Sequence, residues 1–161
     1  MDPIVAQLTQ GLTPHKIALT ISVGSALAMF PVLGTTALLC LLVGIFMRLN
    51  QPIIQAVNLA CAPIHLPFIY YSFIWGRLIF KDPVEFDWRH MARLLRQHPW
   101  QFVQDYDQTV YHAVFVWAVL APFWSLIVYY TALPILRGIE KVRLETAAKK
   151  AVEKAASHPV P

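Results

Sequence analysis

Charged side chains are absent from three long stretches of the chain. Residues 17–47, 49–76 and 108–136 contain no Asp, Glu, Lys or Arg, and their only histidines are His65 and His112. A helix needs about 20 mostly apolar residues to cross the hydrocarbon core of a bilayer. A helix from the core of a soluble protein keeps a polar stripe, and a charged stripe is missing here. The pattern therefore predicts an all-α integral membrane protein.

The first stretch is too long for a single upright helix. The 31 residues from 17 to 47 would span about 46 Å at about 1.5 Å each, against about 30 Å of hydrocarbon. Pro31 lies at the centre and removes a backbone donor, and Gly34 adds conformational freedom. The stretch therefore forms either a kinked, tilted span or two half-helices that meet in a re-entrant hairpin, and we favour the hairpin.

The second stretch repeats this proline-broken design. Pro63 and Pro67 are four residues apart, which predicts that the helix breaks over residues 62–67. We expect a second hairpin whose break faces the one around Pro31. The reason is that bare backbone inside a membrane must be buried in protein or line a wet cavity.

Polar and basic residues occupy the connection at residues 77–107. Within it, Arg89, Arg93 and Arg96 share one face of a helix whose other face is apolar. This pattern is typical of a basic interfacial helix in the headgroup region, and a solvated loop helix with ordinary surface arginines would share it. Residues 137–161 predict a polar helical tail that is solvated or makes a weak assembly contact.

Composition agrees with a membrane location. Of the 161 residues, 57% are hydrophobic and 14% are charged, whereas soluble domains average about 45–50% and about 25%. This balance excludes a disordered chain and a disulfide-built scaffold, and it argues against a water-soluble enzyme. The net charge of +4 resides in basic residues that flank apolar stretches, which favours lipid headgroups over nucleic acid as partners. Cys40 and Cys61 are expected to be packing residues, and we expect no metal and no cofactor.

Basic residues also bear on how often each stretch crosses the membrane. The 77–107 connection contains five Lys or Arg, and the tail contains six. If each stretch crossed once, these two groups would face opposite sides, against the positive-inside bias. The bias favours stretches that each cross the membrane an even number of times, so that each one enters and leaves on the same side. In an intermediate arrangement, the first two stretches are hairpins and the third is a true span. Residues 1–136 are then a single membrane domain, followed by the tail at residues 137–161.

A series of short motifs resembles a known bacterial family. The matching residues are Thr13-Pro14-His15-Lys16-Ile17-Ala18, Gly24, Phe30-Pro31-Val32-Leu33-Gly34-Thr35, Arg48-Leu49-Asn50-Gln51-Pro52, Asn58 and Gly76. In this order, over residues 8–80, they resemble the membrane family catalogued as domain of unknown function 2062. Many members have Asn-Pro-Leu-Thr where this chain has Ala62-Pro63-Ile64-His65. The resemblance implies a bacterial inner-membrane protein and no particular activity.

Two facing breaks would create a polar site inside the membrane. Half-helices that begin at the breaks direct their positive dipole ends inward, and threonine hydroxyls add donors. We therefore assign substrate binding to Pro31, Gly34, Thr35, Thr36, Asn58, Pro63 and His65. His65 would relay protons or bind an anion, or else hold the broken backbone as a neutral imidazole. Asn58 has helix–helix hydrogen bonding as an alternative role. Contacts with lipid headgroups are assigned to Arg48, Arg89, Arg93 and Arg96.

Three kinds of function compete on these residues. We expect a small inner-membrane protein that binds or moves an anionic or amphiphilic, lipid-like substrate at the hairpins, as a homo-oligomer because one copy has few segments to enclose a path. The alternative is a non-catalytic scaffold or accessory subunit of a larger envelope complex. Catalysis ranks last, because no known metal-ligand spacing occurs among the acidic residues near the connection: Asp82, Glu85, Asp87, Asp105 and Asp107.

Overall fold

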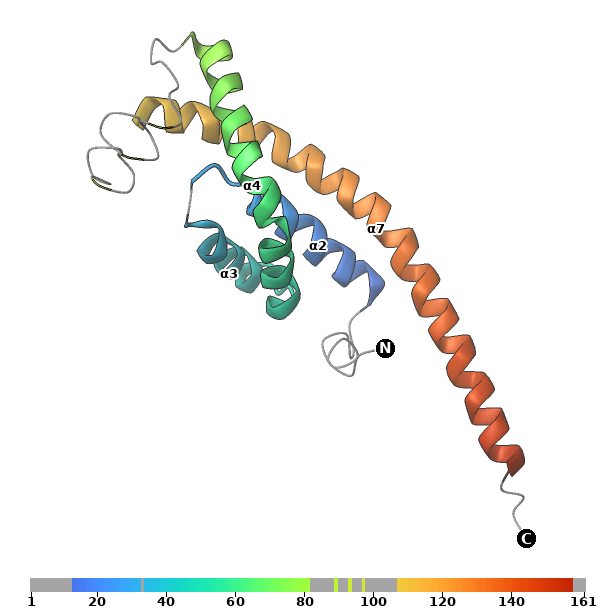
Figure 1. Ribbon diagram of the computed structural model, residues 1–161. Coiled ribbons are helices and arrows are strands. Elements are labelled where there is room, and N and C mark those ends of the chain that lie inside the picture. Colours follow the sequence, from blue (N-terminus) through green and yellow to red (C-terminus); the bar gives the residue numbers. More distant parts are fainter. Residues whose placement is uncertain are drawn as a thin grey trace.

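The computed structural model describes residues 13–32, 34–81, 89, 93, 97 and 107–157, and these ranges contain helices and no strand. The helices whose bounds lie within the described ranges are α2 (Pro14–Ala28), α3 (Thr36–Phe46), α4 (Gln51–Phe80) and α7 (Asp107–Ser157). α2 packs against all three others. Figure 1 shows it lying between α7 on one side and α3 and α4 on the other. The all-α class predicted from the sequence is therefore present throughout the described residues.

A capped start and a following proline set the limits of α2. Thr13 has extended backbone, and its hydroxyl accepts a hydrogen bond from the N–H of Lys16 at 3.3 Å. Pro14 occupies the first position, where a missing donor costs nothing. α2 stops at Ala28, shortly before Pro31, because a proline disfavours helix in the residue that precedes it.

The break predicted around Pro31 separates α2 from α3. Gly34 has a φ of +83°, in the left-handed region that favours glycine. A Cβ built on Gly34 would meet nothing within 4 Å, so the requirement for glycine is conformational and not steric. A proline that ends one helix and a glycine that redirects the chain together produce the turn back toward α2.

Arg48 makes the tight turn between α3 and α4. Its backbone is left-handed, with φ 54°, and its N–H donates to the carbonyl of Ile45 at 3.1 Å. The N–H of Leu49 donates to the carbonyl of Gly44 at 2.8 Å. These paired bonds are those of a Schellman motif. The side chain of Asn50 then accepts a bond from the first turn of α4, so α3 and α4 fold back on each other directly.

α4 overturns the prediction of a break over residues 62–67. It is one helix of 30 residues with Pro63 and Pro67 inside it. Each proline leaves a carbonyl of the preceding turn without its helical partner. The helix nevertheless continues because α2, α3 and α7 pack along it, and prolines are tolerated in apolar helices whose neighbours hold them. The second hairpin expected over residues 49–76 is therefore wrong.

α7 is a single helix of 51 residues that passes through Pro122 and Pro134. At about 1.5 Å per residue it is about 76 Å long, more than twice the thickness of a hydrocarbon core. The third apolar stretch and the polar helix after residue 136 are parts of this one element. Figure 1 shows the C-terminal part of α7 extending well beyond the other helices.

Small side chains allow α2 to sit at the centre of the packing. A Cβ on Gly24 would lie 2.9 Å from Cγ1 of Ile54, so α2 and α4 are in close contact at that point. A Cβ on Gly76 would lie 3.1 Å from the backbone carbon of His112, so α4 approaches α7 in the same way. Small residues are also buried along α2, namely Ala18, Ser22, Ser25, Ala26 and Ala28.

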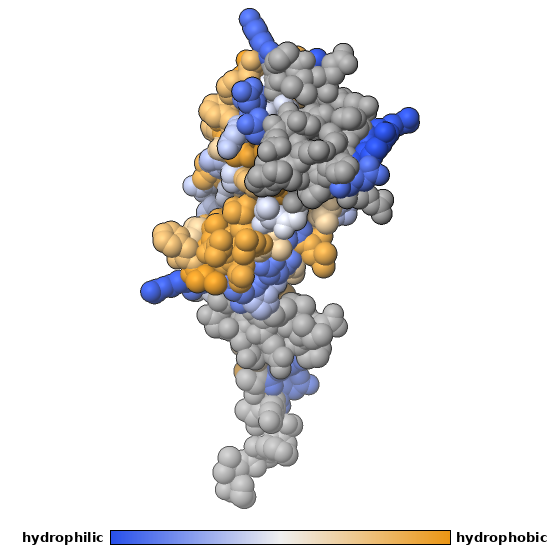
Figure 2. Space-filling model, turned by 90° about the vertical axis from the view of Figure 1, so that its left-hand side faces the viewer, coloured by the Kyte–Doolittle hydropathy of each residue, from blue (hydrophilic) through white to orange (hydrophobic). Residues whose placement is uncertain are grey.

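α4 and α7 are long and apolar enough to cross a membrane. Only 17% and 11% of their most apolar 18-residue windows are buried inside the molecule, whereas a core helix of a soluble protein is mostly covered. Large apolar side chains are exposed on α3 as well, and Phe46 is 89% exposed. Figure 2 shows broad apolar patches on one face of the molecule. Patches of this kind mark surfaces that contact lipid or another protein.

Candidate functional site

Side chains from two other helices cap the end of α2. Nε2 of His65, in α4, donates to the carbonyl oxygen of Phe30 at 2.7 Å. Nε1 of Trp117, in α7, donates to the carbonyl oxygen of Ala26 at 2.9 Å. The last carbonyls of a helix have no partner within it. The carbonyl of Ala26 also accepts the N–H of Met29 at 3.3 Å, so the indole is a second donor to it. The two side-chain bonds tie the tip of the hairpin to the middle of α4 and to α7.

Aromatic rings reinforce the same contact. The rings of Phe30 and Trp117 meet edge to face, with centroids 4.9 Å apart. Nε1 of Trp124, two turns further along α7, donates to the hydroxyl of Ser25 at 3.2 Å. Both indoles are thus held at their N–H ends by α2, which fixes the orientation of their rings.

Hydroxyl groups near the break are engaged with their own backbone. The hydroxyl of Thr35 donates to the carbonyl of Val32 at 2.9 Å, within the turn. The hydroxyl of Ser25 donates to the carbonyl of Ser22 at 3.0 Å. Since each hydroxyl has one hydrogen to donate, these two groups have none left for an anion.

The predicted substrate site is brought together only in part. Pro31 is buried beside Phe30, whose carbonyl contacts His65. The segment around Pro31 and the middle of α4 are therefore in contact, through His65 and without a break in α4. The other members lie at the surface or its margin: Gly34 and Pro63 are exposed, and Thr35, Thr36 and Asn58 are half-buried.

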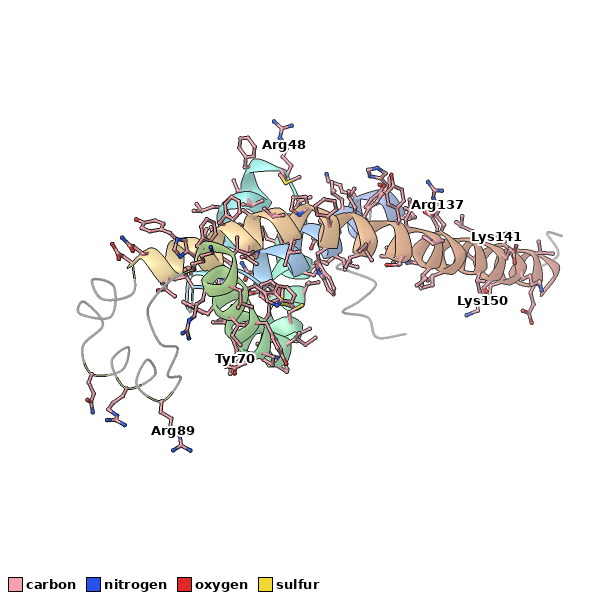
Figure 3. All side chains as sticks on the ribbon, turned by 90° about the horizontal axis from the view of Figure 1, so that it is seen from above. Arg48, Tyr70, Arg89, Arg137, Lys141 and Lys150 are labelled. Atoms are coloured by element: carbon pink, nitrogen blue, oxygen red, sulfur yellow. The ribbon has the colours of Figure 1, made fainter. Side chains whose placement is uncertain are left out.

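The predicted headgroup residues do not form one cluster. Arg48, Arg89 and Arg93 are exposed, and Arg96 lies outside the described residues. Figure 3 shows Arg48 and Arg89 projecting from opposite sides of the molecule. Any headgroups that contact these two arginines are therefore different ones.

Sequence reasoning missed an apolar pocket beside the His65–Phe30 contact. The pocket has a volume of about 330 Å³ and lies where α2, α4 and α7 meet. Its walls include Ala26 of α2, Ile64, Phe68 and Trp75 of α4, and Leu120 and Trp124 of α7. Trp75 and Trp124 could have indicated this pocket in the sequence, but aromatic residues of an apolar helix are equally typical of a membrane interface.

A second apolar pocket extends the first along the same two helices. It has a volume of about 170 Å³, includes Ile79 and Phe115, and shares Trp75 and Leu120 with the first pocket. We call the two together the α4–α7 groove. From Ile64 to Ile79 the groove follows α4 for about 22 Å. That length accommodates an extended acyl chain, because one chain fills about half of a hydrocarbon core about 30 Å thick.

The groove contains no ionisable lining residue. In the part of the chain that the structure describes, no group of three or more His, Cys, Asp or Glu residues is placed to hold a metal ion. Four of the acidic residues considered for catalysis, Asp82, Glu85, Asp87 and Asp105, lie outside the described residues. The chemistry that the groove supports is thus the binding of apolar groups.

The fold and the groove define an all-helical protein with two apolar helices of membrane-spanning length. The chain belongs to the family described as "Uncharacterized protein conserved in bacteria (DUF2062)", whose model matches residues 5–145. This match confirms the resemblance seen in the sequence motifs and extends it into α7. No curated protein and no solved structure matches the chain.

Proposed function

We propose that this protein lies in the bacterial inner membrane and binds an amphiphilic, lipid-like molecule whose apolar tail occupies the α4–α7 groove. The observation that carries the proposal is the groove itself, which is apolar along its whole length and lies between two helices of membrane-spanning length. Binding sites for apolar ligands have this character, with a few polar groups at the margin that orient the ligand.

An acyl chain fits the groove better than a small anion does. An anion without its water needs donors or positive charge around it. The hydroxyl of Thr35 and the indole N–H groups of Trp117 and Trp124 already donate to protein oxygens. An acyl chain needs no hydrogen-bond donors, and contact with the rings of Phe68 and Trp75 would stabilise it.

The end of the groove near Ile79 favours a negatively charged headgroup. Arg77 lies in the last turn of α4, and Lys81 is the first residue after the end of α4. Basic residues at the end of an apolar helix attract anionic headgroups. In this arrangement the acyl chain of the lipid lies along α4 toward Ile64, and the lipid headgroup lies where α4 leaves the apolar region.

The first stretch supports the groove as a re-entrant hairpin in this proposal. α2 and α3 contain 15 and 11 residues, so they are about 22 and 16 Å long, short of the about 30 Å of a full crossing. The tip between them contacts His65, halfway along α4. A hairpin that enters and leaves on one side would bring its tip to this depth.

Photo-crosslinking with a lipid tests the proposal directly. Purified protein in nanodiscs is given phosphatidylglycerol with a photoreactive group in its acyl chain. We expect labelled peptides from α4 and α7 that include Trp75 or Leu120. Leu120→Trp fills the groove and should reduce labelling about tenfold. Leu126→Trp is the control, because Leu126 is exposed on α7 outside the groove lining. Equal labelling of the two variants would refute the proposed site.

Headgroup preference is measured separately. Arg77→Gln removes one positive charge beside the groove and keeps a polar side chain with an N–H donor. We expect weaker labelling by photoreactive phosphatidylglycerol and unchanged labelling by the zwitterionic phosphatidylcholine analogue. Equal losses with both lipids would locate the effect of Arg77 in packing and not in headgroup recognition.

The scaffold remains the second candidate, and one observation favours it. Beyond Leu136, α7 extends about 31 Å, and residues 137–150, 152 and 153 of this part are exposed, as those of a docking element would be. A stable larger partner that co-purifies with the full chain and is lost on deletion of residues 137–161 would support this role. Normal lipid labelling by the same deletion variant would show that binding in the groove does not depend on the partner.

A further inference from the structure

The end of the groove near Ile79 adjoins a histidine of α7. A Cβ built on Gly76 of α4 would lie 3.0 Å from the Cβ of His112 in α7, so the two helices touch at this point. Figure 1 shows α4 crossing the first part of α7. His112 lies one helical turn before Phe115 and Val116, which line the second pocket. His112 therefore continues the α7 side of the groove beyond its lining.

Aromatic contacts fix the orientation of the His112 ring. The imidazole stacks on the ring of Phe80, with centroids 4.2 Å apart and an angle of 4° between the two planes. The ring of Phe80 also meets that of Phe115 edge to face, with centroids 5.3 Å apart. Phe80 thus connects the imidazole to the wall of the groove. Stacking uses the face of an imidazole, whereas its ring nitrogens form hydrogen bonds in the plane of the ring.

Two tyrosines of α7 place His112 at the level of lipid headgroups. Tyr111 and Tyr130 are 71% and 68% exposed, and tyrosines at the ends of a membrane span are typical of the interface with water. The helix rises about 28 Å from Tyr111 to Tyr130, close to the thickness of a hydrocarbon core, which is about 30 Å. His112 directly follows Tyr111, so it lies at the boundary between hydrocarbon and headgroups.

This depth matches the phosphate of a phospholipid. In the proposed arrangement the acyl chain occupies the groove, and the headgroup lies beyond Ile79. The polar groups that follow the acyl chains of a phospholipid are its glycerol esters and then its phosphate. A phosphate oxygen is negatively charged and accepts hydrogen bonds from protein donors, and such charge-assisted bonds are stronger than neutral ones. A donor one helical turn beyond Phe115 is therefore placed to reach the phosphate.

We propose that His112 donates a hydrogen bond to the phosphate of the lipid in the α4–α7 groove, and that the groove therefore selects phospholipids over acyl lipids without a phosphate. This inference rests on the proposed function and adds a class of ligand to it. Arg77 and Lys81 favour headgroups with net negative charge. His112 recognises the phosphate itself, which anionic and zwitterionic phospholipids share.

Photo-crosslinking of the full chain in nanodiscs tests this contact. Three lipids with the same photoreactive acyl chain are compared: phosphatidylglycerol, phosphatidylcholine and diacylglycerol, which has no phosphate. His112→Phe keeps a ring that can stack on Phe80 and removes both ring nitrogens. We expect labelling by both phospholipids to fall about tenfold, as the loss of a hydrogen bond to a charged group predicts, and labelling by diacylglycerol to stay unchanged. His112→Gln retains an N–H donor and should keep part of the preference for phospholipids.

His15→Phe is the matched control. His15 also contacts an aromatic ring, that of Tyr129 with centroids 5.4 Å apart, but it lies at the start of α2 and outside the lining of the groove. Its replacement should leave labelling by all three lipids unchanged. A large excess of glycerol 3-phosphate, which has the phosphate and no acyl chain, should not displace either phospholipid. Displacement would show a site for free phosphate and would overturn the proposal.

The pattern of losses distinguishes a failure at His112 from a failure of the proposed function. Unchanged labelling in His112→Phe, or an equal loss with diacylglycerol and the phospholipids, would overturn the role of His112 and leave the groove in place. An equal loss of phospholipid labelling in His15→Phe would overturn that role as well. If none of the three lipids labels peptides with Trp75 or Leu120 in the unsubstituted protein, the groove itself is refuted, and the role of His112 with it.

Discussion

His65 and Phe30 are 35 positions apart in the sequence, and a hydrogen bond of 2.7 Å joins the imidazole of one to the carbonyl of the other. Phe30 belongs to the turn where α2 has ended, so its carbonyl has no helical donor. His65 is 9% exposed in the middle of α4. His65 thus has a structural role that does not depend on any ligand, because its imidazole completes the hydrogen bonding of the hairpin tip.

Loss of this bond should destabilise the fold. His65→Leu keeps much of the volume and removes the donor, which leaves the half-buried carbonyl of Phe30 without this partner, at a cost of up to about 1–3 kcal/mol. His65→Gln retains an N–H donor and should recover part of that loss. The measurement is thermal unfolding in detergent, followed by tryptophan fluorescence. An unchanged midpoint for His65→Leu would mean that water or another group satisfies the carbonyl equally well.

The conformation of Gly34 should make it sensitive to the smallest substitution. Gly34→Ala forces a side chain into left-handed backbone at φ +83°, which costs about 1–2 kcal/mol. Gly138→Ala is the matched control, because Gly138 lies inside α7 and its Cβ would meet nothing within 4 Å. It should gain about 0.5–1 kcal/mol from helix propensity. Opposite shifts in unfolding midpoint are expected, and a loss of the same size in both would contradict the conformational argument.

The break at Pro31 could be predicted from the sequence. The prolines alone could not distinguish the continuous α4 from a helix with a second break of the same kind. Pro31 is followed three residues later by Gly34, which can take the left-handed backbone that turns the chain. Pro63 and Pro67 have no glycine until Gly76, so the chain has no easy way to turn between them. Neighbouring helices then keep α4 continuous through both prolines. A proline alone is therefore a weaker predictor of a hairpin than a proline with a nearby glycine.

The groove was beyond prediction because its walls depend on how three helices face one another. The orientations of Trp117 and Trp124 are fixed by bonds to residues 91 and 99 positions away. Nothing in a local pattern specifies such partners. The contact between the tip and His65 was closer to prediction, because a histidine in an apolar stretch requires a polar partner.

Replacement of the α4 prolines should preserve the fold. Pro63→Ala and Pro67→Ala each restore a backbone donor inside a continuous helix, and together they should raise the stability by up to about 3 kcal/mol. Circular dichroism should show undiminished helix content, and the unfolding midpoint should rise. If the prolines were needed for a turn within the membrane, the double variant would lose lipid labelling and fold less stably.

A continuous α4 also changes the expected topology. Crossing once, it places Arg48 and Lys81 on opposite sides of the membrane, and α7 returns the tail to the side of Arg48. With the first stretch as a hairpin, Lys16, Arg48 and the tail share one side. This arrangement places eight of the 13 Lys and Arg residues on that side and five on the other. The positive-inside rule then makes the Arg48 side cytoplasmic.

Cysteine accessibility tests this topology in intact cells. Each cysteine is introduced into a variant in which Cys40 and Cys61 are replaced by alanine. A membrane-impermeant maleimide added to spheroplasts should label Lys81→Cys at once. Arg48→Cys and Lys150→Cys should react only after lysis, because the proposed topology places both on the cytoplasmic side. All three positions are exposed, so a difference in labelling reports the side of the membrane and not burial in the protein. If Arg48→Cys and Lys81→Cys react from the same side, α4 does not cross, and the groove must then lie parallel to the membrane surface.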